Sequence, residues 1–167
     1  DAPDDGYTDA NCDGIDGDME RAVFVSNRLG DDMQAGTQAA PVRTISRALD
    51  LVQSSDGVKD QILVDDGIYN EQVQLVSGVT IAGGYEASNE WARSAMVTPA
   101  IEWNRSTQGR VIAVVGKNLS APTLMTHVEV RAGDAPDPGG SVYGLHCDIC
   151  PQLTLRRVTI VAGDGAP

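Results

Sequence analysis

The sequence predicts an all-β chain that is coiled as a parallel β-helix solenoid, with one helix near its N-terminus. From Gln61 onward the chain consists of short apolar runs separated by Gly, Asn, Asp and Pro, which is the pattern of successive β-strands. Two of these runs match each other at an offset of about 30 residues, and such repeats are typical of stacked turns. A single amphipathic segment precedes the strands, where a solenoid needs a cap over its first turn.

The capping helix is expected over residues 43–54. Pro41 lies just before this segment and Gly57 lies just after it, so both ends carry helix-boundary signals. The apolar residues of the segment recur at i, i+3, i+4 and i+7, which places them on one helical face. These residues are Ile45, Ala48, Leu49 and Val52.

The strand pattern repeats most clearly between residues 125–134 and residues 155–164. An earlier version of the repeat, residues 76–84, is expected about two turns upstream if one turn takes about 25 residues. A β-sandwich whose strands resemble one another by chance is the alternative fold. Strands are expected at residues 22–25, 62–64, 73–76, 79–81, 111–115, 125–130 and 153–161.

The chain of 167 residues is long enough for one domain with a continuous core. We expect an Asp-rich leader at residues 1–21 and a solenoid domain at residues 22–167. Residues 162–167 follow a strong strand directly, which leaves the last turn without a cap. The solenoid is therefore expected to continue beyond residue 167 in the full protein, or to be covered by another copy.

The composition is strongly acidic. The formal net charge of −12 would repel a phosphate backbone, so nucleic acid is not an expected partner. No apolar run is long enough to span a bilayer, and no secretory leader precedes Asp1. We therefore expect a soluble chain, extracellular or at the cell surface, from which an export signal has already been removed.

Residues 9–20 satisfy the D-x-[DN]-x-[DN]-G-x5-E spacing of a calcium-binding loop. Gly14 allows the sharp turn, and the other motif positions supply the oxygen atoms that calcium prefers. The loop lies outside an EF-hand, because residues 21–25 read as a strand rather than a helix. The alternative is an acidic, disordered leader. The expected calcium ligands are Asp9, Asn11, Asp13, the Ile15 carbonyl and Glu20.

Three cysteines leave the redox state open. Cys147 and Cys150 form a single C-x-x-C pair, and Cys12 lies in the leader. A disulfide within the pair, or from Cys12 to one of its members, is the first interpretation. Free buried thiols are the second, and zinc binding or redox catalysis is the third.

Three segments resemble a known family. Residues 41–49 (PVRTISRAL), 62–71 (ILVDDGIYNE) and 79–85 (VTIAGGY) resemble the capping helix and first turns of right-handed parallel β-helix proteins, the pectin-lyase-like superfamily. The likeness covers roughly residues 23–162. With its Asp-rich leader, the chain is similar to secreted β-helix proteins of myxobacteria and other deltaproteobacteria. The resemblance implies a right-handed solenoid and a secreted bacterial protein.

The resemblance leaves function open, because that superfamily contains lyases, hydrolases, phage tailspikes and adhesins. Our first hypothesis is a structural or adhesive protein of the bacterial surface or of an extracellular filament. In this hypothesis the chain associates end to end through the solenoid ends and is stabilised by calcium. A tailspike-like trimer is a further alternative.

The second hypothesis is a polysaccharide-binding or polysaccharide-degrading protein, in which Trp91 or Trp103 stacks on sugar rings. The competing interpretation is that these side chains fill the end of a turn or the base of a loop. No catalytic residue is assigned, because the acidic residues match neither a lyase site nor a glycosidase pair, and we do not expect an enzyme. His127 and His146 are interpreted as structural.

Overall fold

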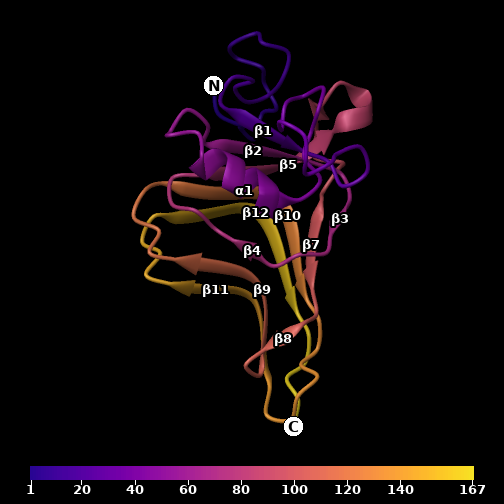
Figure 1. Ribbon diagram of the computed structural model, residues 1–167, viewed down its shortest axis with the longest axis vertical. Helices are drawn as coiled ribbons and strands as arrows, with labels where there is room; N and C mark the ends of the chain where they lie inside the picture. Colours follow the sequence, from indigo (N-terminus) through magenta and orange to yellow (C-terminus); the bar gives the residue numbers. More distant parts are fainter.

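The computed structural model covers residues 1–167 and has a curled, mainly parallel β-sheet at its centre (Figure 1). Five strands lie side by side on its first face, and each pairs in parallel with its neighbour. A run of parallel pairings does not fit the antiparallel β-sandwich alternative. In spatial order the five strands are β1 (Ala22–Val25), β2 (Gln61–Asp65), β5 (Thr80–Glu86), β10 (Thr123–Ala132) and β12 (Leu153–Ala162).

The sheet curls because β10 and β12 each turn a corner along their length, as Figure 1 shows. Residues 124–126 of β10 pair with β5, whereas residues 129–132 pair with β7 (Ala100–Trp103), which in turn pairs with β3 (Ile68–Tyr69). Between the two halves His127 has a positive φ of 54°, and Arg157 at the matching place in β12 has 49°. A single left-handed residue redirects the strand without ending it.

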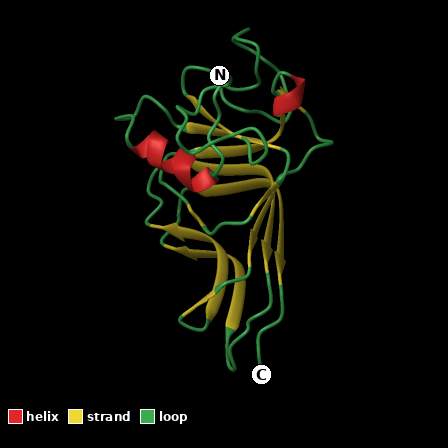
Figure 2. Cartoon of the chain, turned by 45° about the vertical axis from the view of Figure 1, so that its right-hand side comes forward, coloured by secondary structure: helices red, strands yellow, loops and turns green.

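A second sheet lies opposite the downstream halves of β10 and β12 (Figure 2). Apolar residues of both sheets, such as Val114 and Val130, belong to one buried core cluster. The second sheet consists of β4 (Val73–Gln74), β9 (Arg110–Lys117) and β11 (Ser141–Asp148) in parallel, with β8 (Ser106–Thr107) antiparallel to β9. Two short elements complete the chain, the 3-10 turn η1 (Ala87–Asn89) and β6 (Ala92–Arg93), which is antiparallel to β5.

The repeat predicted at an offset of about 30 residues is confirmed, because Met125 in β10 pairs with Leu155 in β12. The prediction that residues 76–84 lie two turns upstream was wrong. Ile81 in β5 pairs directly with Met125, so the two runs are immediate neighbours. The intervening turn is long because it contains η1 and four strands, β6 to β9. A turn length taken from the repeat between β10 and β12 therefore underestimates the length of the turn from β5 to β10.

The predicted capping helix is α1 (Ile45–Gln53), and the side chains of Thr44 and Glu71 accept hydrogen bonds from amides of its first turn. The Thr44 hydroxyl accepts a hydrogen bond from the Arg47 amide at 3.1 Å. The Glu71 carboxylate accepts from the Ile45 and Ser46 amides at 2.8 Å each, which places a negative charge at the helix N-terminus. The buried face is the predicted one and joins the main core: Ile45, Ala48, Leu49 and Val52.

The two ends of the curled sheet differ. Residues 36–42 cover the outer edge of β1: the Phe24 amide donates to the Gly36 carbonyl at 2.9 Å, and the Val42 amide donates to the Phe24 carbonyl at 3.0 Å. At the other end, β12 pairs only with β10, and β11 pairs only with β9. The first edge is therefore closed by the chain itself, and the last edge is open.

Candidate functional site

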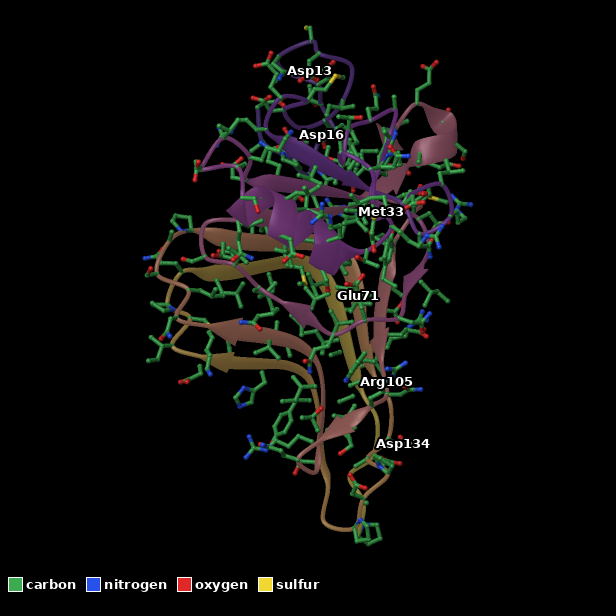
Figure 3. All side chains as sticks on the ribbon, viewed as in Figure 1. Asp13, Asp16, Met33, Glu71, Arg105 and Asp134 are labelled. Atoms are coloured by element: carbon green, nitrogen blue, oxygen red, sulfur yellow. A yellow bond between two sulfur atoms is a disulfide. The ribbon has the colours of Figure 1, made fainter.

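A pocket of about 390 Å³ lies where the ends of β7 and β10 meet. Ala132 and Trp103 are partners in the parallel register, and the Gly133 amide donates to the Trp103 carbonyl at 2.9 Å. This pairing brings the loop after each strand to the same edge of the sheet, where Figure 3 labels Arg105. The residues that line the pocket are Asn70, Glu102, Trp103, Asn104, Arg105, Arg131, Ala132 and Gly133.

Arg131 joins two carboxylates at the rim of this pocket. Its guanidinium donates to Glu102 at 2.5 Å and to Glu129 at 2.6 Å. The hydrogen bond from Arg131 holds the pKa of Glu129 below its usual value, against the opposing effect of burial. Glu129 therefore remains ionised near neutral pH and is unsuited to donate a proton. The arrangement favours binding of a polar ligand over acid–base chemistry.

Trp103 is half-buried and packs against the main core cluster. The Arg105 guanidinium carbon lies 5.4 Å from the Trp103 ring centroid, which is the geometry of a cation–π contact. The indole Nε1 is buried and has no acceptor in the protein, which is uncommon for a buried donor. An oxygen atom of a bound polar molecule can supply that acceptor.

Trp91 lies outside this pocket and exposes almost none of its surface, which does not fit its predicted role in stacking on sugars. It is 3% exposed, and its ring packs edge-to-face on Phe24 with centroids 4.8 Å apart. Trp91 belongs to a small second core cluster that also contains Ile15 and Tyr85. The competing interpretation, in which the aromatic ring fills the base of a loop, describes Trp91 correctly.

The candidate calcium loop at residues 9–20 is closed by hydrogen bonds to its own backbone. The Asp9 carboxylate accepts from the Asp13 amide at 3.1 Å and from the Gly14 amide at 2.9 Å. The Asp13 carboxylate accepts from the Ile15 amide at 3.2 Å and from the Met19 amide at 2.8 Å. Figure 3 shows Asp13 in this loop at the end of the molecule that also carries the N-terminus.

Burial alone would raise the pKa of Asp13. Hydrogen bonds from the Met19 amide, the Asn11 side chain and the Ile15 amide outweigh that effect, so the pKa is lowered and the carboxylate is kept ionised. The donor set is one that a hard cation prefers. However, no three acidic, His or Cys side chains converge closely enough to hold a metal ion in this conformation.

Of the remaining predicted ligands, Ile15 has its side chain buried at 2% exposure and Glu20 is exposed. Glu20 interacts through its backbone carbonyl, which accepts from Lys59 Nζ at 3.3 Å. Calcium binding by this loop stays a prediction.

Sequence reasoning missed the residues that fasten the leader to the sheet. Arg93 forms a buried ion pair with Asp16 at 2.7 Å, and it donates to the Asp4 carbonyl at 2.8 Å. The Tyr85 hydroxyl donates to the Asp16 carbonyl, and Gln61 Nε2 donates to the Asp1 carbonyl at 2.8 Å. The leader therefore packs on the sheet, which does not fit the disordered alternative. No local signal in the sequence links residues so far apart.

Cys147 and Cys150 form a disulfide, and Cys12 is exposed and free. This is the first of the interpretations considered for the three cysteines. The disulfide packs over Gly116 in β9, where a Cβ atom would lie 2.5 Å from Cys147 Sγ. A side chain at position 116 would therefore displace the disulfide, so glycine is required there.

No helix in the structure is long and apolar enough to cross a membrane. No curated protein and no solved structure matches the chain. Residues 28–92 match a protein family of unknown function, DUF1565, which is associated with the pectin-lyase-like β-helix. The match covers less than half of the chain and spans α1, β2 to β5, η1 and the first residue of β6. It leaves out the calcium loop and, apart from Asn70, the residues of the Trp103 pocket. With the curled parallel sheet, it supports a β-helix-like fold.

Proposed function

We propose that this chain is a structural or adhesive part of an extracellular bacterial protein, and that its last turn pairs with a second copy. The observation that carries the proposal is the open outer edge of β11 and β12. Apolar side chains remain exposed on β12, at 39% for Leu155, 43% for Ile160 and 48% for Val161. An open strand edge with apolar side chains is a surface for pairing with further β-structure.

The closed first edge limits how copies can associate. A head-to-tail filament needs two open edges, but residues 36–42 occupy the hydrogen-bonding groups at the edge of β1. We therefore infer a tail-to-tail dimer in which the two last turns face each other, as an isologous contact. Within a longer chain, the same edge would instead carry the next turn of a right-handed solenoid.

Light scattering over a concentration series tests this proposal. We expect the unaltered chain to form a dimer, and Ile160→Lys in β12 to return it to a monomer, because a charge on the edge opposes pairing. Val58→Lys is the matched control, since Val58 is 64% exposed and lies outside β11 and β12. A chain that stays monomeric at every concentration would remove the self-association proposal.

Calcium is the second part of the proposal. The Asp9 and Asp13 carboxylates already lie within one tightly closed loop, so a cation would replace backbone amides as their partner. Thermal unfolding with excess calcium and with chelator tests this directly. We expect a higher melting temperature with calcium, and no difference in Asp9→Asn. Equal melting temperatures for the unaltered chain in both solutions would exclude a stabilising calcium site.

Polysaccharide binding is a second candidate function, favoured by the pocket beside Trp103. The half-buried indole lies next to charged and amide side chains, which is a common composition of sugar-binding sites. A glycan-binding screen should find a ligand whose binding is lost in Trp103→Ala and weakened in Arg105→Ala. Arg110→Ala, an exposed residue outside the pocket, should bind normally. Equal binding by all four proteins would exclude this pocket.

A further inference from the structure

The corner of β10 and β12 carries a group of cationic and titratable side chains that the proposed function does not use. His127 and Arg157 occupy equivalent places in the two strands, and both have left-handed backbone conformations. Arg156 is the neighbour of Arg157. Arg93 in β6 lies near them, because the guanidinium carbons of Arg93 and Arg157 are 5.5 Å and 5.8 Å from the centroid of the same Tyr7 ring. We call these four residues the corner cluster. It stands out on a chain whose formal net charge is −12.

Residues 3–7 of the leader cover the corner cluster, and we call them the strap. The Pro3 carbonyl accepts from Arg156 at 3.5 Å, and the Asp4 carbonyl accepts from Arg93 at 2.8 Å. The Asp5 carboxylate lies 3.6 Å from Arg157 Nε and 3.9 Å from Arg156 Nη1. The strap is thus an acidic peptide held by hydrogen bonds and ion pairs to the corner cluster, together with the buried Pro3.

Tyr7 makes the central contact of the strap. Its hydroxyl lies 2.7 Å from His127 Nε2, and Arg157 Nη1 donates to the same hydroxyl at 3.0 Å. Because an arginine can only donate, the hydroxyl accepts from Arg157, and its own O–H can then donate a hydrogen bond to an unprotonated His127 Nε2. This arrangement suits a neutral His127 ring that carries its proton on Nδ1. That nitrogen is buried and has no partner, so nothing else stabilises a charged ring.

Protonation of His127 breaks this arrangement. Nε2 becomes a donor, so the Tyr7 hydroxyl then faces two donors and has no acceptor for its own proton. The ring also acquires a positive charge beside Arg93 in β6 and Arg157 in β12, while Asp5 is the one carboxylate that opposes this repulsion. Burial, and then the charges of Arg93 and Arg157, lower the pKa of His127 below its ordinary 6.5.

The direction of the pH effect follows from that shift. With the strap open, His127 is exposed to water and takes up a proton at higher pH than when it is covered. The contribution of His127 to strap closure is complete above pH 6.5, and it is lost as the pH falls through the lowered pKa. Acid therefore favours the open strap.

We propose that residues 3–7 are a releasable strap that protonation of His127 opens, and that the uncovered corner cluster binds an acidic peptide segment. The strap itself shows the chemistry that the cluster accepts, a backbone carbonyl and a carboxylate. A ligand with a carboxylate at the place of the Tyr7 hydroxyl pairs with charged His127 and with Arg157, so it binds better at acid pH than the strap does.

A spin label beside Tyr7 measures opening. Thr8 is exposed and follows the strap, so Thr8→Cys with Cys12→Ser gives a single labelling position in the full chain. We expect the label to become more mobile as the pH falls below 6.5. His127→Asn keeps a residue type that tolerates the left-handed conformation but cannot titrate. Its opening midpoint should move to lower pH by at least about half a unit.

The chain supplies its own control, because it has only two histidines. His146→Asn should open at the same pH as the parent. An unchanged midpoint in His127→Asn, or a shifted one in His146→Asn, would overturn the switch. Loss of order in the whole chain is distinguished by circular dichroism, which should stay unchanged through the opening transition.

Ligand class is tested with synthetic peptides of residues 1–10 added to the full chain. The peptide that carries Tyr7→Glu should bind more tightly at pH 5.5 than at pH 7.5, by about tenfold or more. Arg157→Glu in the protein should abolish this binding. If the spin label reports an open strap and the Tyr7→Glu peptide still does not bind, the corner cluster is not an acidic-peptide site.

Discussion

The first and last turns of the sheet both consist of parallel strand pairs, but the strand of the first turn is buried and the strand of the last turn is largely exposed. In the first turn, β1 is fully buried between β2, residues 36–42 and α1. In the last turn, every residue of β12 is at least partly exposed. The difference shows that pairing along the sheet does not depend on both faces being buried. Buried side chains are thus characteristic of β1, and exposed apolar side chains are characteristic of β12.

The largest effect is expected where the leader is fastened above the first turns. Asp16→Ala leaves the Arg93 guanidinium, with 0% of its side chain exposed, as an unpaired buried charge. We expect a loss of about 3–5 kcal/mol in the free energy of unfolding. The double variant Asp16→Leu with Arg93→Met removes both charges and should lose less. Denaturant unfolding measures both, and equal losses would mean that packing, rather than charge, dominates at this place.

A matched pair of leucines tests the comparison directly. Leu63 in β2 is 0% exposed, whereas Leu155 in β12 is 39% exposed. Leu63→Ala should cost about 2–5 kcal/mol of unfolding free energy, because it leaves a cavity in a closed part of the core. In the monomer, at protein concentrations too low for the proposed dimer, Leu155→Ala should cost less than about 1 kcal/mol. Similar costs in a denaturant titration would show that the last turn is covered in solution, as a dimer would cover it.

The disulfide in the last turn should have a modest effect. Cys150 lies three positions after Cys147, with two residues between them, so the loop that they close is short. Cys147→Ser with Cys150→Ser should lower the free energy of unfolding by at most about 2 kcal/mol. The loss should appear as faster amide exchange in β11, with little change in β1. Equal acceleration in both strands would show that the two turns unfold as one unit.

The smallest effect concerns the cap of the first turn. Glu71→Gln keeps one of the two oxygen atoms that accept from the Ile45 and Ser46 amides and removes the charge at the N-terminus of α1. We expect a loss of about 0.3–1 kcal/mol, measured by thermal unfolding at low salt. High salt should reduce the difference, because it screens the charge. A difference that does not change with salt would assign the effect to hydrogen-bond geometry.

The sequence was sufficient for features that depend on local pattern. The period of Ile45, Ala48 and Leu49 predicts α1, and the match between residues 125–134 and 155–164 predicts the register of β10 with β12. Long-range features could not be predicted in this way. The partnership of Arg93 with Asp16 joins residues far apart in the chain, and neither residue lies in a pattern that identifies the other.

The candidate sites show the same difference between features that depend on local sequence and features that depend on long-range contacts. The C-x-x-C spacing makes a Cys147–Cys150 disulfide one natural option, and the structure contains it. Trp91 and Trp103 look alike in the sequence, since each lies in a loop-rich stretch. They differ only in what the fold brings next to them: Phe24 in one case, and the loop after β10 in the other. The exposure of each tryptophan side chain depends on which segments the fold places around it, so composition alone does not distinguish Trp91 from Trp103.

The constant register between β10 and β12 has a consequence for how such a chain can change in length. Because Thr123 pairs with Leu153, residues 123–152 are a complete unit of the repeat. A gene duplication of that whole unit adds one turn in which each strand finds an equivalent partner. An insertion of a single residue within β10 instead moves every following side chain to the opposite face of the strand. Growth by whole units is therefore the route of lengthening that keeps the core intact.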